Sequence, residues 1–471
     1  MLSTLLEKEL REIIYSTKFA VTFGASAVLV ILSFYVGIRN YQESKREYEA
    51  ARSVNIANIA SLTEWRMAQP KVFRKPQPLQ VLVNGTTNDV GRTTEMRAQG
   101  ELNLINSRYN VDPLFAVFRF LDLNFVVVIV FSLFAILFGY DAINGEKESG
   151  TLKLVLSNPV SRAEFILGKL IGSFTALVVP LLIPLLLGCL MIIGFGISLS
   201  PDEWVRLFFI ILGGLLCFGA FLALSTMISG LASRTSVSFL ISLVVWIFSV
   251  LIIPKGSVLL ASAFVDVPNL DAIEAQKRKF SLQQFEQRRQ KMEEWIRANA
   301  RPGEDWSGRF NSFQDSVGKM FENEREEFYG RLNEEWRNRK DHQERWAFGV
   351  ARLSPTVIFQ IAAMNLANTD IALKHRYLED LDRYQDEYAE FIKKKVGTLG
   401  GMRIVIRFSG QQAPEEEKKP LNPSELPELV ERTRGLGDTM AASIVDLGLL
   451  GVLTTLFFAG AFGAFLRFDV R

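Results

Sequence analysis

Residues 141–169 read DAINGEKESGTLKLVLSNPVSRAEFILGK, and this polar stretch separates two long apolar runs. The upstream run covers residues 124–140 and the downstream run covers residues 170–197. Each run has about the length that a helix needs to cross a hydrocarbon core of about 30 Å. Residues 141–169 are therefore predicted to form a short loop at one face of a membrane.

This polar stretch contains two helical pieces with a break between them. Residues 146–156 are predicted to form a helix, because carboxylates occupy its first turn and apolar residues share one face. Pro159 interrupts this helix, since the residue before a proline avoids helical geometry. Ser161 with Glu164 three residues later is a capping box that starts the next helix. The pattern predicts a rigid elbow, the name used below for residues 141–169.

The run EKESGTLKLVLSNPVSRAEFILGK, residues 146–169, resembles the signature of ABC-2 type transporter permeases. In that family the run forms a coupling helix that docks into a cleft on a separate cytoplasmic ATPase. The resemblance implies that the elbow receives force from such an ATPase, whereas the alternative is an ordinary charged loop between spans. The residues that the resemblance assigns to ATPase coupling are Asp141, Glu146, Lys147, Glu148, Gly150, Thr151, Leu152, Leu156, Pro159, Arg162 and Lys169.

A second, less specific resemblance extends over the whole chain. It is to a subgroup of ABC-2 permeases that have an enlarged extracytoplasmic insertion before the last span. This subgroup is related to the permease of the nitrous-oxide-reductase maturation transporter and to gliding-type permeases. Many relatives carry glycine where this chain has Asn368. The residues that carry this second resemblance are Ser354, Pro355, Phe359, Gln360, Asn368, Thr369, Asp370 and His375.

The composition is typical of a membrane protein with large water-exposed parts. Of 471 residues, 49% are hydrophobic and 22% are charged, and the two kinds are concentrated in separate stretches. The net charge of +2 does not favour nucleic acid as a partner. Cys189 and Cys217 lie in apolar runs, and His342 and His375 lack metal-ligand spacing. No disulfide framework, metal or other cofactor is therefore expected in this chain.

Six apolar runs are predicted to cross the membrane. Residues 1–16 precede them and are predicted to form an amphipathic helix in the membrane interface. The fifth run is expected to end at Pro254, and residues 258–264 are apolar but too short to cross. Asp446, in the last run, is a functional candidate or an interfacial carboxylate at a helix N-terminus. The predicted spans are residues 17–38, 124–140, 170–197, 207–231, 237–253 and 441–466.

Two long polar regions, residues 39–123 and 254–440, are predicted to lie outside the cytoplasm. In the first, residues 79–83 precede an Asn-Gly pair and are predicted to form a strand before a hairpin turn. Residues 402–408 alternate like a strand and are expected to pair with it. Helical spacing predicts that the Arg119 and Asp122 side chains pair, whereas residues 411–427 are predicted to be a flexible loop.

The second polar region is predicted to contain long helices. Residues 304–353 would reach roughly 75 Å as one helix. Apolar residues at 3-4 spacing predict a packed seam along it, and a later aromatic stripe is predicted to pack between antiparallel helices rather than to stack on a ligand. The seam is Phe310, Phe313, Val317 and Met320, and the stripe is Tyr377, Leu381, Tyr384, Tyr388 and Phe391.

Six spans place both termini on one side of the membrane, and the short loops indicate which side. Their basic residues gather on one face, which the positive-inside rule makes cytoplasmic. The elbow and both termini are then cytoplasmic, and the resemblance implies the plasma (inner) membrane of a bacterium. The residues behind this assignment are Lys8, Arg11, Lys18, Lys147, Lys153, Arg162, Lys169, Arg234, Arg467 and Arg471.

The predicted fold is a mainly α membrane protein, with six transmembrane helices of the ABC-2, type V exporter-like kind. A large helical extracytoplasmic domain carries a small β element. The sequence has no G-x-x-x-x-G-K-[ST] pattern, so this chain is not expected to be an enzyme, and ATP and Mg²⁺ are expected in the partner ATPase. The resemblance implies two ATPase copies and a second copy of this chain or a homologous permease.

Three functions remain open at this point. The first is export driven by the ATPase, or ATP-driven movement of the outer domain. The second is a mechanotransmission complex, in which the outer helices act on an envelope protein and no substrate crosses. The third is a membrane-anchored coiled-coil scaffold or sensor, which leaves the elbow unexplained.

Overall fold

The computed structural model describes residues 2–87, 93–96, 104–105, 122–157, 160–299, 307–396 and 420–466. The chain forms two compact units, one of Met1–Ile252 with Leu353–Arg471 and one of Ile253–Arg352. Within the described residues, six helices are long and apolar enough to cross a membrane. The predicted mainly α, six-span fold is thereby confirmed.

The first, third, fourth and sixth spans of the first unit are longer than the apolar runs that predicted them. The first continues without a break well beyond residue 38, and the second contains a π-helical stretch. The fourth begins earlier than predicted, because Ser200 and Glu203 form a capping box there. In chain order they are α2 (Thr17–Ala60); α4 (Leu123–Phe125), η3 (Val126–Phe131) and α5 (Ser132–Gly139); α8 (Arg162–Gly194); α9 (Pro201–Leu231); α10 (Thr235–Ile247); and α16 (Leu436–Leu466).

The fifth helical run does not end at Pro254, so that expectation was wrong. Helical residues continue from α10 through π-helical η4 (Phe248–Ile252) into α11 (Ile253–Phe264). A proline removes one backbone donor, and a wider π turn just before it changes the local hydrogen bonding, so the chain remains helical. Residues 258–264, predicted as a separate apolar segment, belong to α11.

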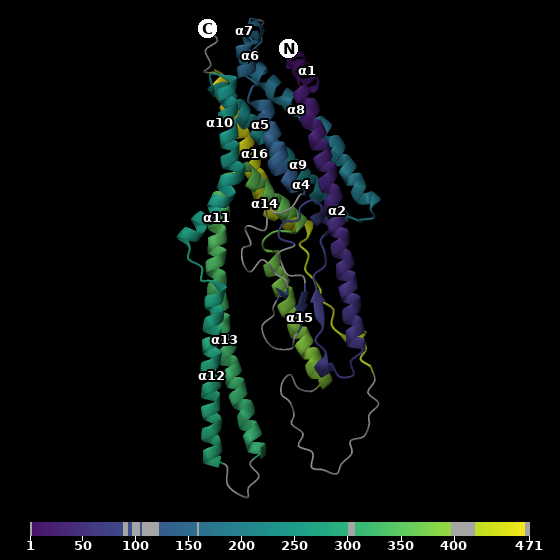
Figure 1. Ribbon diagram of the computed structural model, residues 1–471, viewed down its shortest axis with the longest axis vertical. Helices are drawn as coiled ribbons and strands as arrows, with labels where there is room; N and C mark the ends of the chain where they lie inside the picture. Colours follow the sequence, from purple (N-terminus) through teal and green to yellow (C-terminus); the bar gives the residue numbers. More distant parts are fainter. Residues whose placement is uncertain are drawn as a thin grey trace. The chain divides into compact units, whose positions relative to one another are not determined.

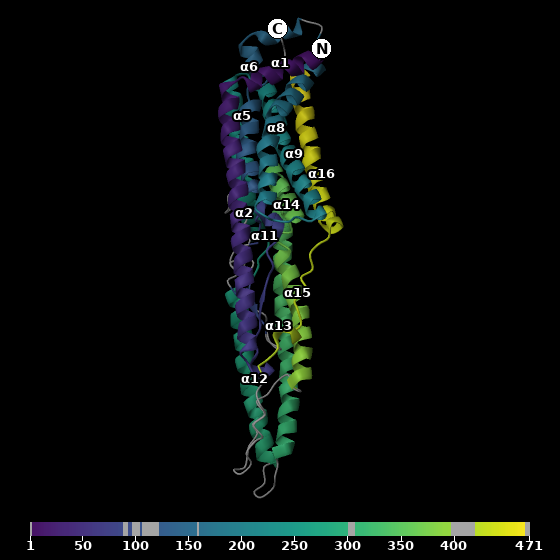
Figure 2. The ribbon, with the colours of Figure 1, turned by 90° about the vertical axis from the view of Figure 1, so that its right-hand side faces the viewer.

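The core of the first unit surrounds α9. Phe218 and Phe221 of α9 are fully buried, and α5, α14 (Pro355–Ala367) and α16 pack against this helix. Figure 2 shows α14 beside α9 and α16. The sequence pattern did not single out α14, because an apolar helix of 13 residues is too short to cross a membrane.

A small antiparallel sheet and α15 (Leu373–Val396) form a second core in the same unit. The sheet has the order β1 (Lys71–Phe73), β2 (Thr93–Glu95), β3 (Leu104–Ile105). The aromatic stripe of α15 is buried, as predicted. Its described partners include Val72 of β1, Met96 directly after β2, and Trp65 of η1 (Trp65–Met67). The expectation that it packs between antiparallel helices was therefore wrong.

Residues 79–83 are all described, and they do not form the predicted strand. The chain there forms η2 (Pro78–Val81), a 3₁₀-helix with proline in its first turn. Leu79, Val81 and Leu82 are all buried, so these residues lack the alternate exposure of a half-buried strand. Residues 402–408, most of 411–427 and Arg119 lie outside the described residues. The short η5 (Pro423–Glu425) precedes α16.

The second unit contains α11 and a pair of long helices, α12 (Leu270–Asn299) and α13 (Ser307–Ala351), which are drawn in Figure 1. The single long helix predicted over residues 304–353 is confirmed by α13, apart from its ends. Its predicted seam is also confirmed, because the ring of Trp295 lies 5.2 Å from that of Phe310 and 5.5 Å from that of Phe313.

Candidate functional site

The elbow forms two short helices at one end of the first unit, together with α1 (Leu2–Ile14) and the start of α8 (Figures 1 and 2). These helices are α6 (Asn144–Glu148) and α7 (Thr151–Leu156). The single helix predicted over residues 146–156 was therefore wrong. Gly150 separates the two with a φ of 75°, a conformation that glycine adopts without steric cost.

The helix that follows the elbow begins as predicted. Ser161 Oγ accepts a hydrogen bond from the Glu164 backbone N–H at 3.2 Å, and the Glu164 carboxylate accepts from the Ser161 N–H at 3.0 Å. Arg162 donates from Nη1 to the carbonyl oxygen of Leu466 at 2.7 Å, so the start of α8 is tied to the end of α16. Pro159 lies outside the described residues.

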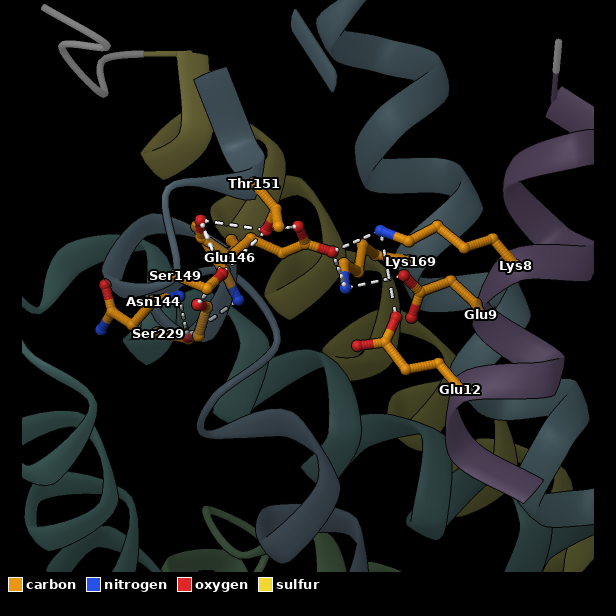
Figure 3. Close-up of polar contacts among 11 residues, drawn as sticks. Lys8, Glu9, Glu12, Asn144, Glu146, Ser149, Thr151, Lys169 and Ser229 are labelled. Atoms are coloured by element: carbon orange, nitrogen blue, oxygen red, sulfur yellow. Dashed lines mark hydrogen bonds and ion pairs between the residues drawn. The ribbon is translucent and has the colours of Figure 1, made fainter. Parts of the chain in front are cut away.

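A buried ionic cluster joins the elbow to α1 and α8 (Figure 3). Lys169 Nζ lies 2.7 Å from Glu9 Oε1 and 3.1 Å from Glu146 Oε1, and Lys8 Nζ lies 2.8 Å from the same Glu146 oxygen. The side chains of Lys169 and Glu146 are only 7% and 6% exposed. Thr151 also donates a hydrogen bond to the Glu146 carboxylate. We call Lys8, Glu9, Glu146 and Lys169 the elbow cluster.

The elbow cluster depends on close packing of α1 against α8. A Cβ on Gly172 would lie 2.7 Å from the Cβ of Glu9, so only glycine permits this approach. Burial raises the pKa of Glu9, and the neighbouring ammonium group of Lys169 opposes that rise. The sequence predicted that α1 lies in the membrane interface with its charged face in water, but the Glu9 carboxylate of that face is buried in the protein.

Two lysines and two glutamates make the elbow cluster balanced in charge. Glu9, Glu12 and Glu146 lie close enough together to share a metal ion. The ammonium groups of Lys8 and Lys169 already supply positive charge at these carboxylates. The arrangement is that of a structural ionic network, which holds three chain segments in one geometry.

Two further contacts attach the elbow to neighbouring spans. Glu148 Oε1 accepts a hydrogen bond from the backbone N–H of Thr235 at 2.8 Å, at the first residue of α10. Lys18 Nζ, in the first turn of α2, lies 3.1 Å from Asp141 Oδ2. Movement of the elbow would therefore act directly on α2 and α10 as well as on α1 and α8.

The predicted coupling residues divide into a buried and an exposed group. Glu146, Lys169 and Leu152 are buried, and Leu152 packs in a cluster with Phe165. Leu156 and Thr151 are half-buried. The exposed members are Lys147, Glu148 and Gly150, and beside them lies Leu154, which is 68% exposed and was not predicted. Leu154 is thus an apolar side chain on the exposed face of the elbow.

Several residues of the site carry no signal in the sequence. Lys8 and Glu9 look like ordinary surface charges of an amphipathic helix, and Ser229 and Thr235 look like small polar residues of spans. Their roles follow from contacts across 85 to 160 positions of sequence, such as the Asn144–Ser229 hydrogen bond and the Lys169–Glu9 ion pair. Such contacts leave no local pattern of spacing.

Asp446, the other predicted site residue, is not part of the elbow. It lies in α16 and is 1% exposed. It is roughly 30 Å along that helix from Leu466, which contacts the start of α8. Asp446 has an interaction within the protein, and its functional role stays a prediction.

Comparisons with known proteins cover the chain unevenly. The sequence model of the ABC-2 family transporter proteins matches residues 3–470. A protein of Stutzerimonas stutzeri, described as a probable ABC transporter permease protein NosY, is 36% identical over 124 residues, which are 26% of this chain and 44% of the relative. The NosY protein of Pseudomonas aeruginosa, described likewise, is 34% identical over 132 residues, which are 28% and 48%. The chain thus matches less than half the length of these curated relatives.

Proposed function

The chain belongs to the ABC-2 family of transporter proteins and is a membrane permease subunit, and from that premise we propose that its elbow receives force from a separate ABC ATPase. ATP-driven closure of the ATPase displaces α6 and α7. The membrane helices attached to the elbow then move with it. The ATPase holds ATP and Mg²⁺, and this chain supplies the lever and the membrane path.

One observation carries the proposal: the elbow is bonded to each of its neighbours by polar contacts. Glu146 reaches α8 and α1 through Lys169 and Lys8, and Glu148 reaches α10. Arg162 links the start of α8 to the end of α16. A push on the exposed face of the elbow is therefore transmitted to several helices instead of being absorbed by a loop.

The assembly that we propose has the elbow and both termini in the cytoplasm of a bacterium. The basic residues of the short loops support this orientation. Two copies of this chain, or one copy with a homologous permease, would bind two ATPase copies. ABC-2 permeases of this size provide half of a membrane path, so the second permease completes it.

We propose that this movement drives export or displaces the outer parts of the chain.

A second function, mechanotransmission to an envelope protein, is favoured by α2. This helix has 44 residues and is roughly 66 Å long, about twice the hydrocarbon thickness. Lys18 ties its start to Asp141 of the elbow, and Asn55 near its other end bonds to Lys71 of the sheet at 2.8 and 3.0 Å. One continuous helix thus connects the elbow to the second core, which contains the sheet and α15.

The exposed face of the elbow provides the test. Leu154→Asp places a charge where an ATPase would cover an apolar side chain, and Leu282→Asp changes an equally exposed leucine of α12 (68% and 70% exposed). The wild-type complex with the ATPase that co-purifies with it is reconstituted in liposomes, and ATP hydrolysis is measured. We expect Leu154→Asp to lose most of the ATPase binding and stimulation, whereas Leu282→Asp keeps both.

A charge reversal at Glu148 gives a second, independent test of the coupling site. Glu148→Lys removes the acceptor for the Thr235 N–H without changing the core of the elbow. If both Leu154→Asp and Glu148→Lys bind and stimulate the ATPase like the wild type, the elbow is not the coupling site and the proposal fails.

A further inference from the structure

Asn144 is the first residue of α6 and has a fully buried side chain, with 0% exposure. Its backbone N–H donates to Ser229 Oγ at 3.2 Å, so the main chain is held. Its side chain differs, because neither Oδ1 nor Nδ2 has a hydrogen-bond partner. Figure 3 shows the carboxamide pointing away from the elbow cluster.

The unpaired carboxamide contrasts with the rest of the elbow. Glu146, Glu148 and Ser149 all have partners for their side-chain oxygens. Burying an amide without hydrogen bonds is unfavourable, and an apolar side chain of similar shape avoids that cost. In the conformation described here, asparagine is therefore a poorer choice than leucine or valine at this position.

Two serine hydroxyls bonded to the backbone just before and at the start of α6 suggest how this cost is recovered. Ser229 Oγ on α9 accepts from the backbone N–H groups of both Ile143 and Asn144, each at 3.2 Å. Ser238 Oγ on α10 donates to the Tyr140 carbonyl oxygen at 2.7 Å. Both hydroxyls hold the turn that leads into α6. Displacement of α6 would break these bonds and leave both hydroxyls free to pair with other polar groups.

We propose that Asn144 is a positioning residue of coupling, whose carboxamide forms its hydrogen bonds only after the elbow has been displaced. The proposal rests on the elbow being the input of ATPase force. A contact shifts an equilibrium between two conformations only if it differs between them. The unpaired carboxamide of Asn144 is unfavourable in the conformation described here, and hydrogen bonds formed after displacement would supply the required difference.

The test is a substitution that separates stability from coupling. Asn144→Leu removes both polar atoms at similar size, and Asn144→Val does so with a smaller side chain. In the complete permease–ATPase complex, we expect the melting temperature to rise by about 2–4 °C. We expect permease-stimulated ATP hydrolysis to fall about ten-fold, which corresponds to about 1.4 kcal/mol. A merely structural asparagine would give a lower melting temperature on substitution.

Three outcomes would overturn the inference. These are a lower melting temperature in both variants, failure of both to fold, and unchanged ATP hydrolysis in a stabilised variant. Binding of the ATPase is measured in parallel and should stay at the wild-type level, because the exposed face of the elbow is unaltered. Wild-type binding and stimulation with both Leu154→Asp and Glu148→Lys would refute the coupling site itself, so the two failures are distinguishable.

Discussion

Charged residues are prominent both in the elbow cluster and along the α12–α13 pair, but burial differs between the two regions. Lys169, Glu9 and Glu146 are almost completely buried, and Lys169 Nζ lies 2.7 Å from Glu9 Oε1 and 3.1 Å from Glu146 Oε1. On α13 the Arg339–Glu335 pair has a similar length of 2.7 Å, yet both side chains are about half exposed. The long helices associate through rings instead, such as Phe280 stacked 4.0 Å from Phe328.

This difference teaches that ion-pair distance alone does not measure structural importance. Water screens an exposed pair, and the entropy lost in holding two long side chains offsets most of its attraction. A buried network is held in one arrangement, because removing any member leaves a charge without compensation. The elbow cluster therefore fixes geometry, whereas the pairs on the long helices mainly keep a surface soluble.

Removing the central cation of the elbow cluster should have the largest effect. Lys169→Met leaves the carboxylates of Glu9 and Glu146 without their shared partner, and we expect a loss of about 3–5 kcal/mol of stability. Thermal unfolding in detergent measures this loss. Adding Glu9→Gln to Lys169→Met should restore part of it, and a single variant as stable as the wild type would contradict the ionic account.

A buried carboxylate held by backbone donors extends the comparison. Asp122 accepts hydrogen bonds from the backbone N–H groups of Phe125 and Asn84, and burial raises its pKa from 3.8 to about 6. Between these pH values the folded protein holds a proton that the unfolded chain has released, so stability falls as pH rises. The shift corresponds to a change on the order of 3 kcal/mol.

Asp122→Asn should remove that pH dependence even if it lowers stability at every pH. The melting temperature of the wild type and of Asp122→Asn is measured between pH 4 and 7. We expect the wild-type profile to decline more steeply over this range. Parallel profiles would show that the carboxyl group does not titrate in the folded protein.

Disrupting the ring contacts of the long helices should have an intermediate effect. Phe280→Ala removes a half-buried ring and its stacking on Phe328, and we expect a cost of about 2 kcal/mol. Because α12 and α13 belong to their own compact unit, the loss should appear first as faster hydrogen exchange in these two helices. Faster exchange in α8 and α9 instead would contradict this assignment.

Neutralising an exposed pair should have the smallest effect. Arg339→Gln breaks the contact with Glu335 on the surface of α13, and we expect a change below about 1 kcal/mol. Thermal unfolding at low and high salt provides the measurement. A loss as large as that of Lys169→Met would remove the distinction between the two regions.

Much of the fold was predictable because its signals are local. Long apolar runs predicted six membrane helices, and the Ser161–Glu164 spacing predicted the capping box at the start of α8. The predicted strand at residues 79–83 failed, since burial on every side of η2 replaced the alternating exposure that a strand requires. The prediction that the fifth helix ends at Pro254 was wrong, because residue preferences do not predict the π-helical turn that precedes this proline.

The elbow was predictable in position but not in its contacts. Its family resemblance and polar composition identified residues 141–169 as the region of interest. The separation of α6 from α7 depends on the left-handed conformation of Gly150, and the burial of Glu146 depends on lysines from two other helices. Neither follows from residue spacing within the elbow.

The sequence by itself determined that this chain crosses a membrane through six helices and carries a polar elbow between the second and third. Hydrophobic length and local capping decide those features, and both are properties of short segments. Only the tertiary structure decided that Glu9 faces Lys169, that Glu148 reaches α10, and that Asn144 is buried without a partner. The physical reason is that desolvation and pairing depend on which distant segments meet, and residues far apart in the chain carry no local record of that meeting.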